Sequence, residues 1–267
     1  MRIKIYENAP LLIAESKRKK ALIVADLHIG YCLKLLEQGI TARKIMQSQI
    51  DMIKGIIDHL TPDDIIIVGD LKHNIPKVIT YEKNIFDEMF NWLKKYDVRV
   101  YLIKGNHDSG IDKYSNRINI VSPRGFIHEK IGFFHGHAWP SINVLTDGEI
   151  LITAHIHPVI TLREGRESHT EKVYLLTKIT LDNIIKKYYK NKIMHNTTYD
   201  SKNLVRKLIV LPAFNPMLSS GVNVINWSTN NSRSIVHTFL GESIKDIEII
   251  LWNGIYLSSL RDLVRMT

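Results

Sequence analysis

Short apolar runs and amphipathic stretches alternate along the first hundred residues of the chain. The runs at residues 21–25 and 65–68 contain only aliphatic side chains, which is typical of strands that are buried on both faces. Between them, apolar residues recur every three or four positions, as in a helix that covers one face of a sheet: Met46, Ile50, Ile53, Ile57 and Leu60. This order predicts a βαβ unit.

The alternation of helix and strand patterns continues to residue 103. Ile85, Met89 and Trp92 share one face of a second predicted helix, and residues 98–103 form a third predicted strand. Buried strands that alternate with helices predict an α/β protein with layered sheets. After residue 115 the helical pattern stops, and short strand patterns predict a second sheet: residues 117–121, 125–128, 132–134 and 149–153.

The last hundred residues are less regular. Residues 163–207 show little apolar periodicity and hold eleven Lys and Arg against five Asp and Glu, so we interpret them as a basic insertion with a helix at 181–190. A strand at 207–211 and a hairpin around Asn253 and Gly254 are predicted within residues 208–267. Neither a repeat nor a low-complexity linker interrupts the chain, which favours one domain over residues 1–267.

The composition excludes two classes of protein. Cys32 is the only cysteine, which excludes a disulfide scaffold, and no apolar run approaches the roughly 18 residues that span a bilayer. The first twenty residues lack the basic start and apolar middle of a signal peptide, so we expect a cytoplasmic protein with no membrane partner. The net charge of +9 fits an anionic partner such as nucleic acid, although a general bias towards lysine explains it too.

Polar clusters follow the predicted strands, at the sheet edge where ligands bind in α/β proteins. Their residues are suited to binding metal: Asp26-Leu27-His28, Asp70-Leu71-Lys72-His73, Asn106-His107-Asp108, His135-Gly136-His137 and His155-Ile156-His157. Asp26 and His28 point the same way if the strand geometry continues, and Gly69 and Gly105 permit tight backbone turns. Each cluster alone is more often ordinary turn chemistry, but chance does not readily explain five in succession.

This order of motifs resembles that of the calcineurin-like metallophosphoesterases, which runs D-x-H, G-D-x-x-(D/H), G-N-H-(D/E), H and G-H-x-H. All five motifs occur between residues 21 and 158. His73 and the pair His157-Pro158 are similar to the SbcD-related and ligase-associated endonucleases of this family, and so is the segment at 211–216. Ala154 departs from the usual glycine without removing a ligand. Residues 163–207 and 230–267 lie outside the resemblance.

The resemblance implies a four-layer αββα sandwich of two mixed β-sheets that holds two divalent metal ions. It assigns one ion to Asp26, His28, Asp70 and His157. It assigns the other ion to Asp70, Asn106, His135 and His155, so that Asp70 bridges the pair. Oxygen and imidazole donors without a thiolate favour Mn²⁺ or a related divalent ion over a structural zinc ion.

The resemblance also implies catalytic roles for two histidines. His107 protonates the leaving oxygen, and His73 positions or stabilises the phosphoryl group. For His137 two roles stay open, a contact with substrate or metal and a hydrogen bond to a ligand. Four residues of the basic segment are candidates for contacts with substrate phosphates: Lys186, Lys187, Lys190 and Lys192.

Together these features predict a two-metal phosphodiesterase with nucleic acid as its favoured substrate and partner, of the kind that acts in DNA repair. One alternative is a phosphatase or phosphodiesterase acting on small nucleotides or cyclic nucleotides. Another is a non-catalytic scaffold of the same fold, against which the complete ligand set and His107 argue. The choice between DNA and RNA, the position of cleavage and the oligomeric state stay open, a homodimer included.

Overall fold

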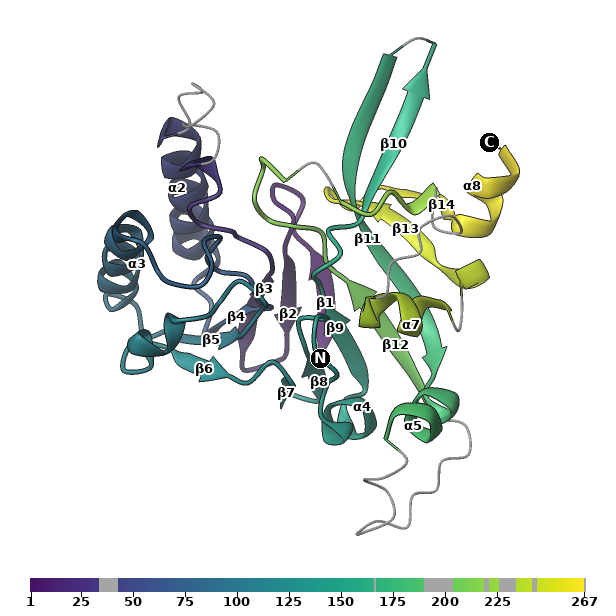
Figure 1. The fold of residues 1–267 in the computed structure, drawn as a ribbon, viewed down its shortest axis with the longest axis horizontal. Helices are drawn as coiled ribbons and strands as arrows, with labels where there is room; N and C mark the ends of the chain where they lie inside the picture. The colour runs from purple at the N-terminus through teal and green to yellow at the C-terminus, as the bar shows by residue number, and fades with distance from the viewer. Residues whose placement is uncertain are drawn as a thin grey trace.

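Two β-sheets pack face to face in the computed structural model, and helices cover the outer face of each sheet (Figure 1). The structure describes residues 1–33, 43–165, 167–189, 204–218, 221–225, 234–241 and 244–266. The four-layer αββα arrangement expected from the sequence is therefore confirmed.

The first sheet has six strands, which neighbour one another in chain order. They are β1 (Arg2–Ile5), β2 (Leu12–Glu15), β3 (Lys20–Val24), β4 (Asp64–Ile67), β5 (Arg99–Ile103) and β6 (Asn119–Val121). Strands β3 to β6 are parallel, and β1 and β2 are antiparallel additions at one edge. The prediction that residues 117–121 join the second sheet is wrong, because β6 pairs with β5. The chain between these strands contains the 3-10 helix η1 (Ile111–Tyr114), so the helical period of the earlier crossovers is missing there.

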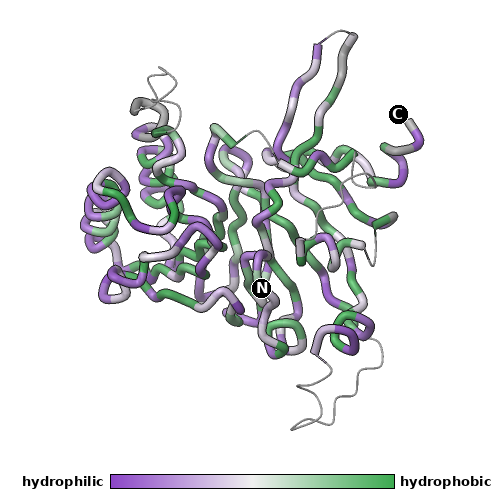
Figure 2. Tube along the Cα trace, viewed as in Figure 1, coloured by the Kyte–Doolittle hydropathy of each residue, from purple (hydrophilic) through white to green (hydrophobic). Residues whose placement is uncertain are grey.

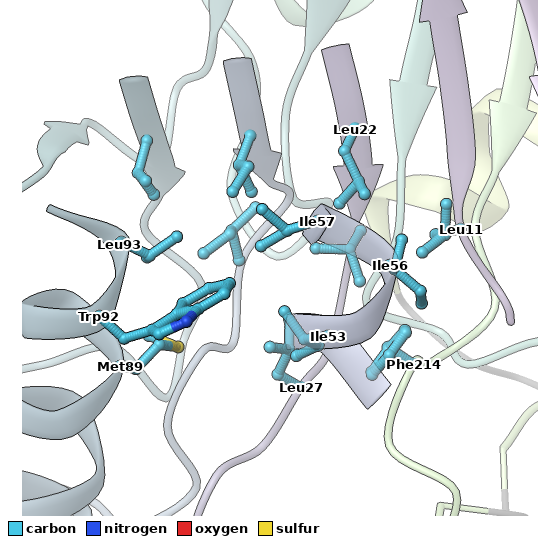
Figure 3. Close-up of a pocket in the computed structure, with 14 residues that line it drawn as sticks. Leu11, Leu22, Leu27, Ile53, Ile56, Ile57, Met89, Trp92, Leu93 and Phe214 are labelled. Carbon is cyan, nitrogen blue, oxygen red and sulfur yellow. The ribbon is translucent and has the colours of Figure 1, made fainter. Parts of the chain in front are cut away.

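Helices α2 (Arg43–Leu60) and α3 (Thr80–Leu93) cover the outer face of the first sheet. Successive residues of β3 serve the two sides, since Leu22 packs in the helix layer and Ile23 packs against the second sheet. A cavity of about 30 Å³ lies in the helix layer, and Trp92 is among the side chains that line it (Figure 3). Its lining offers no polar partner for water, so it is a packing defect rather than a binding site.

The second sheet has eight strands, seven of them in the order β14-β13-β11-β12-β9-β8-β7, with β10 paired to β11. They are β7 (Phe126–His128), β8 (Ile131–Phe133), β9 (Ile150–Thr153), β10 (Val159–Glu164), β11 (Glu167–Thr180), β12 (Val205–Val210), β13 (Glu248–Leu251) and β14 (Tyr256–Ser259). Strands β8, β9 and β12 are parallel neighbours. The outer layer contains the short helices α4 (Ile142–Asp147), α5 (Asp182–Tyr188), α7 (Ile235–Gly241), η3 (Ile244–Asp246) and α8 (Leu260–Met266).

The interpretation of residues 163–207 as an insertion does not hold for β11 and the start of β12. The second half of β11 pairs with both β12 and β13, and Val173 and Leu175 in it are buried. Its polar first half pairs with β10 in a hairpin that projects from the two sheets (Figure 1). The polar hairpin and the buried half form one continuous strand, so a pattern averaged over the segment obscures the short apolar run at 173–176.

Apolar residues are concentrated along the strands, whereas the outer helices alternate between hydrophobic and hydrophilic positions (Figure 2). One core lies between the two sheets and includes Phe133 and Ile209. A second core lies under α2 and α3, and a third lies under the short helices of the other side. No helix in the described ranges combines the length and the apolar character needed to cross a membrane.

A buried carboxylate ties the two sheets together at the amino-terminal end of β4. Arg99 binds both oxygens of Asp64 through Nε at 2.7 Å and Nη2 at 2.8 Å. Nε2 of His128, on β7 of the other sheet, lies 3.0 Å from Oδ2 of Asp64. The carboxylate group of Asp64 is 1% exposed, while the Arg99 side chain is half exposed, so the pair is buried on one side only.

Candidate metal centre

The carboxyl ends of five strands from both sheets meet at one place and carry the predicted site residues. Asp26 and His28 follow β3, Asp70 and His73 follow β4, His107 follows β5, His135 follows β8, and His155 and His157 follow β9. A hydrogen bond of 2.8 Å from His135 Nδ1 to the Val68 carbonyl joins the end of β8 to the end of β4. The arrangement of strands in two facing sheets thus gathers side chains that are up to 131 positions apart in the sequence.

The structure forms two groups of side chains that could each hold a metal ion. Asp26, His28 and His157 make one group, with their ligand atoms within 4.8 Å of one another. A second group, equally close, contains Asp70, His135 and His155. The carboxylate of Asp70 lies between the two, because its Oδ2 is 3.5 Å from His28 Nε2 and 3.4 Å from His135 Nε2. These six residues are all among the seven that the resemblance assigned to the two ions, and the seventh is Asn106.

Several buried atoms of these groups fit a bound cation. Asp26 Oδ1 and the Nε2 atoms of His28, His135 and His157 are buried, and none has a hydrogen-bond partner among the described residues. His135 donates from Nδ1 to a carbonyl, so its Nε2 faces Asp70 and carries either a proton or, when the ring is neutral, a lone pair that can bind a metal ion. At 3.4 Å from the Asp70 carboxylate, this nitrogen needs a positive charge beside it, which a proton supplies in the absence of metal and a bound metal ion supplies in its place. The nitrogen and oxygen donors fit divalent ions of the first transition series.

The charges of the two carboxylates control the protonation of the cluster. Burial disfavours the charged forms of Asp26 and Asp70, but the nearby histidines outweigh this effect and lower the pKa of both carboxyl groups. For His135, burial also acts against the charged form, yet Asp70 and Asp26 prevail and raise its pKa to about 9. Burial lowers the pKa of His28 to about 3, so its ring is neutral and able to act as a ligand at neutral pH.

Five residues of the two groups have backbones in the left-handed region. The φ angles are 53° for Asp26, 42° for His28, 48° for Asp70, 76° for His155 and 44° for His157. Residues with a Cβ atom adopt this region at a cost of about 1–2 kcal/mol each. Such strain concentrates at functional sites, where the surrounding fold holds the chain in position. The conformations of the loops after β3, β4 and β9 therefore direct these side chains towards the two metal-binding groups.

His73 and His107 form a third group with His28 at the edge of the cluster. Their ligand atoms also lie within 4.8 Å of one another, and the rings of His73 and His107 stack at 5.2 Å. His107 Nδ1 lies 2.6 Å from the carbonyl oxygen of His73, so Nδ1 carries the proton and Nε2 is left for another partner. The structure therefore places both predicted catalytic histidines beside the predicted ligands.

Other predicted site residues are less closely tied to the cluster. Asn106 is exposed, although its neighbours Gly105 and His107 both touch Asp70. The His137 ring lies 5.4 Å from the His135 ring, and its buried Nδ1 has no hydrogen-bond partner among the described residues, so both roles considered for it stay open.

The two described lysines among the predicted phosphate contacts lie away from the two metal-binding groups. Lys186 and Lys187 are exposed on α5, which follows the end of β11 opposite to the carboxyl ends of β9 and β12. Lys190 and Lys192 are outside the described residues. The structure thus does not bring Lys186 and Lys187 to the metal cluster, and the contact of the four lysines with phosphates stays a prediction.

The two motif glycines leave space for ligands, which the sequence did not reveal. A Cβ atom at Gly69 would lie 2.1 Å from Nδ1 of His135, and its φ of 84° also favours glycine. Gly105 does not have a positive φ, but a Cβ atom there would lie 2.1 Å from Oδ1 of Asp70. The explanation of Gly105 by a tight turn is therefore incomplete, because close packing against Asp70 is what requires glycine.

Two further residues support the ligand loops through the backbone, and sequence reasoning assigned them no role. Asn215 donates from Nδ2 to the carbonyls of Leu27 at 2.9 Å and His28 at 3.3 Å. The carboxylate of Asp108 accepts hydrogen bonds from Gly105 N at 2.8 Å and Lys72 N at 3.2 Å, which joins two loops. Both residues stand in segments that the motif comparison included, but only the three-dimensional contacts reveal what they hold.

Comparison with known proteins agrees with the fold and with the order of the motifs. A model of the calcineurin-like phosphoesterase family matches residues 19–248. No curated protein sequence matches the chain. Among solved structures, the nuclease MPE of Pseudomonas putida has a TM-score of 0.57 at 17% identity, over 96% of this chain and 99% of that one. At this identity, the similarity shows a shared fold.

Two smaller structures align with part of the chain. The phosphoesterase Yfce from E. coli has a TM-score of 0.34 at 19% identity, over 56% of this chain and 76% of its own. A protein of unknown function, AQ665 from Aquifex aeolicus, has a TM-score of 0.35 at 16% identity, over 51% of this chain and 78% of its own.

Proposed function

Because the chain belongs to the calcineurin-like phosphoesterase family, we propose that it is a two-metal phosphodiesterase that cleaves nucleic acid. The observation that carries this proposal is the pair of adjoining groups, Asp26, His28 and His157 beside Asp70, His135 and His155. The calcineurin-like fold uses a dinuclear metal centre, and these residues have the donor atoms and the burial that it needs.

The protein contributes the positions and the charges of the site. Asp26, His28 and His157 would hold one ion, His135, His155 and Asn106 would hold the other, and the Asp70 carboxylate would be shared. When bound, such a pair of ions polarises a phosphate group and makes water acidic enough to attack near neutral pH. The chain's own residues must then orient the phosphodiester and deliver a proton to the oxygen that leaves.

His107 is the residue that we propose as the proton donor. Its Nδ1 donates to the His73 carbonyl, which leaves Nε2 to carry a proton towards a substrate. His73, stacked on the same ring, would bind the phosphoryl group. A departing alkoxide of nucleic acid needs a proton, whereas 4-nitrophenolate leaves without much help, so the two kinds of substrate test this role.

Three features support nucleic acid as the substrate class. The chain has a net charge of +9, and it resembles the SbcD-related and ligase-associated nucleases in His73 and in His157-Pro158. The nuclease MPE, over whose length the chain aligns almost completely, has the same fold.

A panel of substrates tests the proposal. We would compare Mn²⁺-dependent hydrolysis of bis-(4-nitrophenyl) phosphate, 4-nitrophenyl phosphate, single-stranded DNA and RNA, and duplex DNA. Cleavage of the diester and of a nucleic acid is expected. A preference for the monoester indicates a small-molecule phosphatase instead, and no turnover with any divalent ion indicates a non-catalytic scaffold.

The variant His107→Ala separates proton donation from metal binding. We expect it to keep both ions, to lose about 10²–10⁴-fold in activity on nucleic acid, and to lose much less on bis-(4-nitrophenyl) phosphate. His169→Ala, in the projecting hairpin, is the matched control and should behave as wild type. Equal losses on both substrates would reassign His107 to binding, and loss of metal would make it a structural residue.

A further inference from the structure

Glu82 is a completely buried carboxylate beside the metal cluster that the proposed mechanism does not use. It lies in the first turn of α3, twelve residues beyond Asp70, and its side chain is 0% exposed. A carboxylate is buried in this way only where several donors compensate the loss of water. Its contacts therefore indicate what the chain uses it for.

Four donors bind the Glu82 carboxylate, and all belong to the segment that carries His73. Oε1 accepts from His73 N at 3.2 Å, from Asn74 N at 2.9 Å and from Asn74 Nδ2 at 2.9 Å. Oε2 accepts from Ile79 N at 3.1 Å, at the start of α3. A single oxygen thus holds the backbone on both sides of His73.

One of these contacts leads directly to His107. The N–H of Asn74 and the C=O of His73 belong to the same planar peptide group. The N–H end binds Glu82 at 2.9 Å, and the C=O end accepts from Nδ1 of His107 at 2.6 Å. Any rotation of this peptide group breaks both hydrogen bonds. The negative charge of Glu82 next to the N–H also makes the carbonyl oxygen of the same peptide a stronger hydrogen-bond acceptor.

The surroundings of Glu82 keep this arrangement rigid. A Cβ atom at Gly30 would lie 2.8 Å from Glu82 Oε1 and 2.9 Å from Asn74 Nδ2, so the loop after β3 closes over the carboxylate. The buried Lys72 donates to the Asn74 carbonyl, and Glu82 is close enough for its charge to act on this ammonium group. The negative charge is therefore balanced inside the protein.

We infer that Glu82 is a positioning residue for His107, which it orients through the peptide group between His73 and Asn74. The carboxylate fixes the peptide, and the peptide oxygen keeps one proton of His107 on Nδ1. A second proton is then carried by Nε2, which faces the leaving oxygen and transfers that proton to it. A carboxylate commonly orients a catalytic histidine by direct contact. Here the backbone transmits the same effect. The catalytic part of this inference rests on the proposed role of His107 as proton donor.

The test uses Glu82→Gln in the metal-loaded protein, with Glu88→Gln as the matched control. The glutamine side chain retains the shape and one acceptor oxygen but loses the charge and an acceptor for Ile79 N. Glu88 lies on the same helix and forms a half-exposed ion pair with Lys54, away from the cluster. Both variants should keep two ions, measured by elemental analysis, because neither residue belongs to the two metal-binding groups.

The first measurement does not depend on activity. With Mg²⁺ or Zn²⁺ as a diamagnetic ion, ¹H–¹⁵N spectra of the imidazole rings report the tautomer of His107, whose signals are assigned by their loss in His107→Ala. We expect the neutral His107 ring to exist only as the Nδ1–H tautomer in wild type and in Glu88→Gln, and as a mixture of tautomers in Glu82→Gln. An unchanged His107 tautomer in Glu82→Gln would overturn the inference.

The second measurement compares leaving groups. Glu82→Gln should lose about 10- to 100-fold in kcat on diphenyl phosphate, whose phenolate leaves poorly, and less than about threefold on bis-(4-nitrophenyl) phosphate. Equal losses would contradict a role through His107. If wild type hydrolyses neither diester while the tautomer still depends on Glu82, the proposed function fails and the positioning contact stands.

A second variant covers the case in which Glu82→Gln loses metal or does not fold. Asn74→Ala removes one of the three donors to Oε1 and leaves the carboxylate in place, at a partly exposed position. It should shift the tautomer and the leaving-group ratio in the same direction by a smaller amount. No shift in a folded, metal-loaded Asn74→Ala would then count against the inference.

Discussion

The variant Gly105→Ala should weaken the binding of both metal ions by adding a single methyl group next to Asp70. The new Cβ atom would lie 2.1 Å from Asp70 Oδ1 and 2.5 Å from Asp70 N, where an ordinary contact is at least 3.4 Å. Backbone and carboxylate must therefore separate by about 1 Å. Metal ligands tolerate deviations of only about 0.2 Å, so the shared carboxylate leaves both ions at once.

The expected losses in metal affinity and in stability follow from the short contacts of the new Cβ atom and from the position of Asp70 between the two metal-binding groups. We expect the affinity for both ions to fall by at least 10- to 100-fold, which is the typical effect of disturbing a ligand from outside. Overpacking of this kind costs about 1–3 kcal/mol in the free energy of unfolding. For a chain of this size, that cost lowers Tm by roughly 2–10 °C, so the protein should still be folded at 25 °C.

Gly55→Ala is the matched control for this experiment. Gly55 lies inside α2, and a Cβ atom there meets nothing within 4 Å. The change should raise the free energy of unfolding by up to about 1 kcal/mol and leave metal binding unaltered. Mn²⁺ titration followed by electron paramagnetic resonance, with thermal unfolding alongside, measures both quantities. If Gly105→Ala binds two ions with wild-type affinity, the argument from close packing is refuted.

Other perturbations have distinct expected outcomes. Asp70→Asn should empty both metal positions together, while His28→Asn should weaken mainly one; two ions per chain in Asp70→Asn, by elemental analysis, would contradict a shared ligand. Replacing the four lysines of the predicted basic segment with alanine should flatten the salt dependence of duplex binding, since each neutralised phosphate adds about 0.9 to its slope. An unchanged slope would leave them as a solvated surface. Asp64→Asn should cost about 2–3 kcal/mol in the free energy of unfolding, because the Arg99 guanidinium loses a carboxylate that accepts two hydrogen bonds; an unchanged Tm would mean that water replaces the pair.

The parts of the fold that the sequence predicted are those whose contacts are local in the chain. The aliphatic runs at 21–25 and 65–68 and the helix between them correspond to β3, β4 and α2. Strand β6 was assigned to the wrong sheet because its partner β5 is connected to it without an α-helix. Strand β11 was missed because half of it stands in a polar hairpin, and a pattern averaged over the segment mixes two environments.

The residues of the candidate site also fall into those that the sequence predicts and those that only the structure identifies. Residues that act through their side chains, such as Asp70 and His135, are evident from the motifs because few residue types can do that chemistry. Glu82 and Asn215 act through backbone groups of other segments, and Asn215 reaches residues 187 and 188 positions away. Any residue with a suitable acceptor or amide could do this, so no residue type marks the position. Only the assembled fold identifies them.

The left-handed backbones of the predicted ligands have a consequence for laboratory evolution. Glycine and asparagine relieve this strain, and replacing a buried Asp or His also removes an unshared electron pair from the cluster. A mutant library of this chain selected only for heat resistance should therefore enrich such replacements at Asp26, His28, Asp70, His155 and His157. The variants enriched by that selection would be thermally stable proteins without a metal centre. Selection schemes for this fold consequently need retention of metal as a second criterion.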